Sequence, residues 1–169
     1  EPLLSGGTGS VSHTEEVPSF LPDRFEPGTP NIPGILGLHA ALCDLEQTDM
    51  DKLHQHELEL TQYFINGLMQ MDPSESTLRA IGKHNTIERT SVVSVQTLQT
   101  DMARVAYEMD DTYGIMTRVG LHCAPSAHKT LGTYPEGTIR FSFGPENTHH
   151  EVDLALHALA EITGSPYHL

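Results

Sequence analysis

Basic residues are scarce in this chain. Only 9 of its 169 residues are lysine or arginine, against 23 aspartates and glutamates, and the formal net charge is −14. Nucleic acids and anionic membrane surfaces both require a basic patch on the protein that binds them. The composition therefore argues against both as partners and favours a soluble protein, or one that binds a basic protein.

Cysteines and long apolar runs are also scarce. The 2 cysteines, Cys43 and Cys123, stand far apart and form no Cys-x-x-Cys pair, so we expect neither a disulfide framework nor a structural zinc site. No segment approaches the run of about 18 apolar residues that a membrane span needs. The first residues lack the basic-then-apolar pattern of a signal peptide. We therefore expect a cytoplasmic protein without a membrane segment.

Turn residues and apolar periodicity predict an α+β fold in three parts. Residues 1–30 combine a glycine-rich run with several prolines, which predicts an extended arm. Residues 31–73 should form linking and packing helices, and residues 74–169 a small C-terminal domain in which an antiparallel sheet packs against helices. The predicted elements are helices Ile32 to Glu46 and Thr48 to Met71, strand Leu78–Ile81, an extended piece near Ile87, strand Thr90–Leu98, helix Asp101–Thr112, strands Ile115–Leu121 and Thr138–Phe143, and helix Thr148–Thr163.

Helix ends carry the clearest local signals. Asn31 precedes Pro33 as an N-cap, Thr100 and Asp101 begin another helix, and Thr148 with Glu151 forms a capping box. Gly114 should end the helix that begins at Asp101, because glycine adopts the left-handed conformation without penalty.

Cys123 stands in a connector between two predicted strands. Pro125 stops the first strand after Cys123, and Pro135 with Gly137 prepares the second, so the connector should be short and ordered, with a helical turn in it. Pairing of the strands would bring Cys123 and Arg140 into one neighbourhood. A nearby cation favours the thiolate that a catalytic cysteine needs, while the alternative is a small buried residue at a strand end.

Arg140 is the second candidate site residue. An arginine among the apolar residues of a strand is explained by a bidentate grip on a carboxylate, or by an ordinary ion pair on the solvent face. Arg118 could line the same site. His122, Cys123 and His128 could suggest zinc, but their spacing matches no common structural site and no fourth ligand is evident, so we expect no metal.

Two long segments resemble one family. The run from Arg118 to Asp153, which begins RVGLHCAPSAHKTLGTYPEGTIRFSFGPENT, resembles the C-terminal part of cysteine desulfurases and selenocysteine lyases, in the class V aminotransferase branch of enzymes that use pyridoxal phosphate (PLP). The run RFEPGTPNIPGILGLHAAL, Arg24 to Leu42, resembles the RFE-x-GTPN block of the same family. The resemblance covers nearly the whole chain.

The resemblance implies a fold and a set of roles. It implies the small C-terminal domain of the PLP-dependent aspartate-aminotransferase-like fold, as part of a homodimeric parent enzyme whose large domain would precede Glu1. Cys123 would take sulfur from L-cysteine, or selenium from L-selenocysteine, and pass it to an acceptor protein; Arg140 would bind the substrate carboxylate. Gly7, Thr8 and Ser10 would reach the PLP phosphate of the partner subunit, whereas the residues alone favour a flexible terminus or linker for this glycine-rich run.

The lysines limit what the chain can do alone. None of Lys52, Lys83 and Lys129 stands in a context that resembles the family's cofactor lysine, so we expect no covalent PLP on this chain and an inactive fragment of an active parent. Two alternatives remain open at this point. One is a class V relative with other chemistry, such as a selenocysteine lyase, an epimerase or an aminotransferase. The other is a thiol or binding module that functions without PLP.

Overall fold

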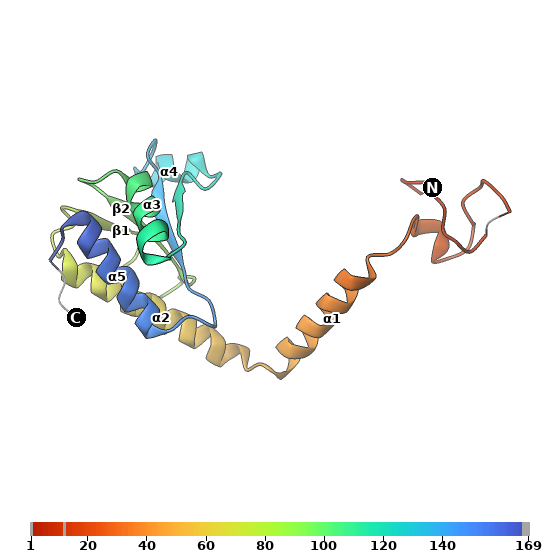
Figure 1. Ribbon diagram of the computed structural model, residues 1–169, viewed down its shortest axis with the longest axis horizontal. Coiled ribbons are helices and arrows are strands. Elements are labelled where there is room, and N and C mark those ends of the chain that lie inside the picture. The colour runs from red at the N-terminus through yellow and green to blue at the C-terminus, as the bar shows by residue number, and fades with distance from the viewer. Residues whose placement is uncertain (1, 12, 167–169) are drawn as a thin grey trace. The chain divides into compact units, whose positions relative to one another are not determined.

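The computed structural model describes residues 2–11 and 13–166. The chain forms two compact units, Glu1–Asp49 and Met50–Leu169, and each is described by itself (Figure 1). The first unit holds the arm, a 3₁₀ helix η1 (Asp23–Phe25) and helix α1 (Ile32–Gln47). As expected, Asn31 caps α1: its side chain accepts a hydrogen bond from the Gly34 amide at 3.1 Å.

The second unit is built on a four-stranded antiparallel sheet. The strand order is β1-β2-β4-β3, so β3 forms one edge. The strands are β1 (Leu78–Ile81), β2 (Val92–Thr97), β3 (Arg118–Gly120) and β4 (Thr138–Ser142), and the helices are α2 (Met50–Met71), α3 (Met102–Tyr113), α4 (Pro125–Leu131) and α5 (His149–Thr163).

Helices α2, α3 and α5 pack on one face of the sheet and enclose the core (Figure 1). On α2, Leu60, Phe64, Leu68 and Met71 form a buried apolar stripe, because these residues recur at three- and four-residue steps. The α5 face contributes further buried side chains: Val152, Ala155, Leu156 and Leu159. This arrangement confirms the α+β class.

The opposite face of the sheet is polar. Since side chains alternate along a strand, Ser94, Arg118 and Arg140 lie on one face in register with one another. Val93, Val95 and Ile139 lie on the other face and are fully buried in the core. The sheet therefore holds its arginines away from the helices.

Most predicted helix ends are confirmed, whereas two strand predictions need correction. Asp101 caps α3, Gly114 ends it in the left-handed conformation, and the capping box at Thr148 is present. The expected strand Ile115–Leu121 is paired only over Arg118–Gly120. Ile87 lies in an exposed turn instead of an extended segment, because the Arg89 amide bonds back to the Thr86 carbonyl there.

No helix within the described residues is long and apolar enough to cross a membrane.

Candidate active site

The candidate site begins where β3 ends beside β4. The strand register places Arg118 opposite Arg140 and Gly120 opposite Thr138. Gly120 and Gly137 both have positive φ, 109° and 82°, and a Cβ on Gly137 would collide with the Gly120 carbonyl. Only glycine combines this conformation with such a close approach. The glycine pair therefore lets the chain leave β3 and turn at once beside the start of β4.

A tight turn follows β3 and presents Cys123. The Ala124 amide donates a hydrogen bond of 2.8 Å to the Leu121 carbonyl, and the two residues between them, His122 and Cys123, have φ values of 49° and 58°. Helix α4 then starts at Pro125, so the connector is ordered as predicted. Cys123 is exposed and forms no disulfide. Exposure rules out the alternative of a small buried residue at a strand end.

Arg118 and Arg140 form an uncompensated pair of positive charges. Like charges directly opposite each other on neighbouring strands destabilise a sheet. Neither guanidinium has a carboxylate partner among the described residues, and Nε of Arg140 is buried there without any hydrogen-bond partner. An ordinary ion pair therefore does not explain Arg140. Two arginines without a counter-charge are typical of a site for a carboxylate or another anion.

Several other cations are engaged elsewhere in the molecule. Lys83 forms an ion pair of 2.7 Å with Glu88, and Arg104 forms one of 2.6 Å with Glu108. Arg89 donates to the backbone carbonyl of Ile81 at 3.2 Å. Arg118 and Arg140 have no ion-pair partner among the described residues, and the strand register sets them opposite each other close to the Cys123 turn.

His122 links the turn to the arginines. Its Nε2 lies 3.2 Å from the Thr138 hydroxyl, two residues before Arg140, while Nδ1 is buried without a partner among the described residues. Burial and the nearby charge of Arg140 lower the pKa of His122 below its ordinary value. The sequence pattern suggested His122 only as a possible metal ligand. Its position next to Cys123, the candidate nucleophile, was the signal that could have indicated a role in the site.

The histidines near Cys123 make protein contacts. Nδ1 of His128, a buried residue of α4, lies 2.7 Å from the Thr133 hydroxyl, and the rings of His122 and His128 are 5.8 Å apart. The part of the chain that the structure describes holds no group of three or more histidine, cysteine or acidic side chains placed to bind a metal.

The predicted phosphate loop lies in the first unit. Gly7, Thr8 and Ser10 belong to a segment without helix or strand, in which the Thr8 and Ser10 hydroxyls are 2.8 Å apart. The Gly28 amide donates to the Gly7 carbonyl at 2.8 Å and closes this loop. A shallow cavity of about 380 Å³ beside it is also lined by Glu15 and Glu16.

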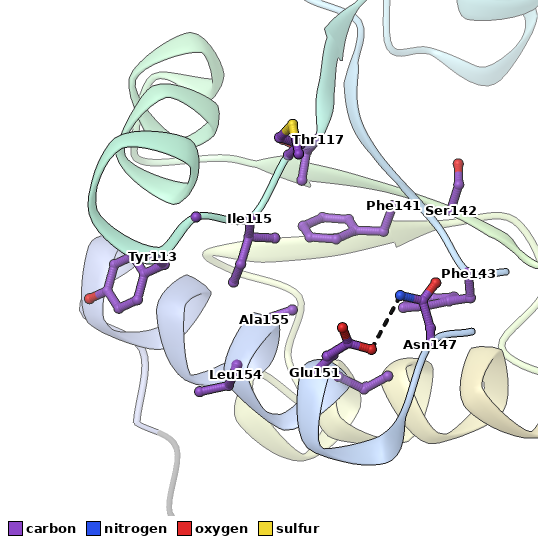
Figure 2. A pocket seen from close by; sticks show the side chains of 13 residues that line it. Tyr113, Ile115, Thr117, Phe141, Ser142, Phe143, Asn147, Glu151, Leu154 and Ala155 are labelled. Atoms are coloured by element: carbon purple, nitrogen blue, oxygen red, sulfur yellow. Dashed lines mark hydrogen bonds between the residues drawn. The ribbon is translucent and has the colours of Figure 1, made fainter. Parts of the chain in front are cut away.

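A separate cavity of about 410 Å³ opens where β3 and β4 diverge (Figure 2). Figure 2 shows Ile115, Phe141 and Phe143 on its walls, with a hydrogen bond of 3.3 Å from the Asn147 amide to the Glu151 carboxylate at its rim. Neither Cys123 nor Arg140 lines this cavity. The polar groups suited to chemistry lie at the other end of β3.

Several known proteins are similar to this chain. The family described as Aminotransferase class-V matches residues 1–155. A probable cysteine desulfurase of Pyrococcus abyssi is 34% identical over 168 residues, which is 98% of this chain and 40% of the relative. One from Staphylococcus epidermidis is 33% identical over 163 residues, covering 95% of this chain and 38% of the relative.

Solved structures agree with these relatives. The apo structure of a cysteine desulfurase from Thermococcus onnurineus is similar to this chain with a TM-score of 0.77 and 32% identity, over 97% of this chain and 40% of that one. The cysteine desulfurase CsdA of Escherichia coli, described as an S-sulfonic acid, is similar to this chain with a TM-score of 0.68 and 26% identity. The similarity covers 95% of this chain and 38% of that one. The chain thus spans about 40% of the length of these relatives. From the match over residues 1–155, the chain belongs to the class V aminotransferase family.

Proposed function

We propose that this chain is the C-terminal, sulfur-accepting part of a PLP-dependent cysteine desulfurase, with Cys123 as the nucleophile. The observation that carries the proposal is the exposed Cys123 on a tight turn whose other central residue, His122, lies within the electrostatic reach of Arg140 and Arg118, two arginines that lack a counter-charge. A nucleophilic cysteine must be accessible and near positive charge, because the thiolate is the reactive form. The names of the relatives support this chemistry.

Arg140 anchors the substrate in this proposal. Its half-buried guanidinium, which has no carboxylate partner among the described residues, holds the α-carboxylate of L-cysteine. Arg118, directly opposite on β3, supplies a second positive charge at the same place. Binding of the carboxylate also relieves the repulsion between the two arginines, which would otherwise destabilise the strand pair.

The reaction at Cys123 is a transfer of one sulfur atom. The Cys123 thiolate attacks the Sγ atom of the substrate, a new S–S bond forms, and the Cβ–Sγ bond of the substrate breaks. The electron pair of the broken bond stays on the substrate carbon, which takes up a proton to give alanine. The proton that Cys123 released balances this uptake, so L-cysteine and a thiol become L-alanine and a persulfide.

Part of the N-terminal arm carries groups that could bind the phosphate of PLP. The hydroxyls of Thr8 and Ser10 and the open backbone at Gly7, where a Cβ would meet nothing within 4 Å, are groups that can hold a phosphate. We infer that they serve the cofactor of a second subunit in a homodimer. The electron sink for cleavage of the substrate is the chemistry that bound PLP supplies.

The cofactor lysine of this proposal lies outside the chain. Lys83 is held by Glu88, and Nζ of Lys129 lies 5.0 Å from the centre of the Tyr134 ring.

The acceptor of the persulfide sulfur in this proposal is a second protein. The two unpaired cysteines, Cys43 and Cys123, suit a reducing cytoplasm.

Turnover by the full-length enzyme tests this proposal. Cys123→Ser should abolish sulfide release from L-cysteine, while Cys43→Ser, at a half-buried position on α1, should leave it unchanged. Full activity of Cys123→Ser would refute the assignment.

A further inference from the structure

The backbone of the Cys123 turn is in a conformation that its residues rarely adopt. His122 and Cys123 both have positive φ, and the Ala124 amide bonds back to the Leu121 carbonyl, so residues 121–124 form a β-turn with two left-handed central residues. Such turns are dominated by asparagine, aspartate and glycine. Cysteine rarely adopts positive φ and histidine does so less readily than glycine, so contacts outside the turn must help to hold it in place.

The His122 side chain makes the contacts that can do this. Its Nε2 lies 3.2 Å from the hydroxyl of Thr138, the first residue of β4, which is only 1% exposed. Its ring also faces that of His128 on α4, at 5.8 Å between centres, and His128 is itself bound to the Thr133 hydroxyl. The imidazole therefore joins the turn to the strand on one side and to the helix on the other.

The surroundings favour a neutral imidazole at this place. Burial lowers the pKa of His122, and the positive charge of Arg140 lowers it further. His128 and Arg118 act in the same direction, whereas a hydrogen bond with the backbone of Thr138 raises the pKa. A neutral ring can keep its contact with the Thr138 hydroxyl without adding a third positive charge beside the arginines.

We propose that His122 is the positioning residue of the site: through Thr138 it anchors the left-handed turn that presents the Cys123 thiol. This role rests on the proposed function of Cys123, but it is a property of the turn and is measurable without sulfur transfer. His122 acts on the reaction only through the placement of its neighbour. Its loss should loosen the turn and leave the core of the sheet intact.

Matched substitutions on both sides of the contact test this role. Thr138→Val keeps the shape of the side chain and removes the hydroxyl, whereas Thr138→Ser keeps the hydroxyl. His122→Ala removes the ring, whereas His122→Asn keeps a polar group and tolerates positive φ. The readout is amide hydrogen exchange at Ala124, whose N–H closes the turn, compared with exchange at Val95 in the core of β2.

We expect Thr138→Val and His122→Ala to speed exchange at Ala124 by about fivefold to tenfold, the effect of one lost hydrogen bond. Thr138→Ser and His122→Asn should stay within about twofold of the unmodified chain, and Val95 should not change. Equal acceleration at Ala124 and Val95 would overturn the proposal, because it would indicate general destabilisation. An unchanged exchange rate at Ala124 in Thr138→Val would also overturn the proposal. Exchange at Ala124 that is as fast in His122→Asn as in His122→Ala would overturn it too.

Sulfur transfer is measured separately in the full-length enzyme. Thr138→Val and His122→Ala, which remove the anchor, should also lower the yield of persulfide on Cys123. The conservative variants Thr138→Ser and His122→Asn should keep that yield near the value of the unmodified enzyme. If the unmodified enzyme formed no persulfide at Cys123, the proposed function would fail while the exchange result still decided the role of His122. Loosened turns with unchanged persulfide yield would show that the anchor does not serve catalysis and would overturn its assignment to the site.

Discussion

At the scale of single residues, the proposed carboxylate site depends on Arg140. Its position on β4 follows from the alternation of the strand, and its buried Nε lacks a partner within the described residues. The ligand that best completes this arrangement is a carboxylate, because a guanidinium offers parallel donors to both oxygens. Arg118, on the exposed edge strand, can add charge but is less enclosed.

Replacement of Arg140 by lysine should weaken substrate binding in the full-length enzyme. Lysine keeps the charge but loses the planar fork, so we expect KM for L-cysteine to rise about tenfold to hundredfold. Steady-state kinetics measure the change. Arg104→Lys on α3 is the matched control, because Arg104 is paired with Glu108 at the surface, and its KM should be unaffected. An unchanged KM in Arg140→Lys would remove Arg140 from the substrate site.

Asp72 is a buried carboxylate that joins α2 to β1. It accepts hydrogen bonds from the backbone amides of Thr77 at 2.6 Å and Leu78 at 3.0 Å, and from the Ser74 hydroxyl at 2.8 Å. Burial by itself would raise the pKa of Asp72, but these hydrogen bonds outweigh it and hold the pKa well below the ordinary value of 3.8. The ionised form therefore stabilises the folded chain.

Asp72→Asn should destabilise the chain by about 1–3 kcal/mol at pH 7, as measured by urea unfolding. Because the folded pKa is depressed, the contribution of ionised Asp72 is complete above the unfolded pKa near 4 and declines as the pH falls below it. The difference between the two proteins should therefore shrink at pH 3. Asp111→Asn, at an exposed position on α3, should change stability by less than about 0.5 kcal/mol. A difference that grows on acidification would contradict the assignment.

At the scale of elements, two glycines decide how β3 connects to β4. Gly137 has positive φ and lies against the Gly120 carbonyl, so any side chain there would push the two segments apart. Gly137→Ala should lower the free energy of unfolding by about 1–3 kcal/mol and alter the Cys123 turn that follows Gly120. Gly144→Ala is the control, because its Cβ would meet only the Asn147 side chain at an ordinary 3.9 Å. Equal stability of the two variants would disprove the close approach.

Helices could be predicted better than strands, for a physical reason. The caps at Asn31, Asp101 and Thr148 depend on residues within one turn of the helix, and the sequence contains all of them. Strand pairing depends on a distant partner. The apolar and β-branched run from Ile115 has strand character throughout, but it diverges from β4 before Arg118 and leaves a cavity instead of a ladder.

The site could be predicted in part. The antiparallel pairing of the strands on either side of the connector was expected, and the register confirms it over Arg118–Gly120. That Cys123 and Arg140 act in one site stays a prediction. The left-handed turn could not be foreseen, since neither histidine nor cysteine is a typical central residue of such a turn. The role of His122 could not be predicted either, because it depends on the position of Thr138 in the folded chain.

For the whole molecule, charge and family lead to one account. An acidic chain of the class V aminotransferase family keeps two arginines without acidic partners at one end of its sheet and exposes a thiol beside them. The helices and the sheet core hold this arrangement in place. In this account, Cys123 is the residue that accepts the sulfur atom of L-cysteine.

Mass spectrometry of the full-length enzyme tests this claim most directly. After brief incubation with L-cysteine, free thiols and persulfides are alkylated under non-reducing conditions, and the peptides that carry Cys123 and Cys43 are compared. The account predicts one additional sulfur atom on the Cys123 peptide, none on the Cys43 peptide, and its disappearance when reductant is added before alkylation. Additional sulfur on Cys43, or unmodified Cys123 during active turnover, would contradict it.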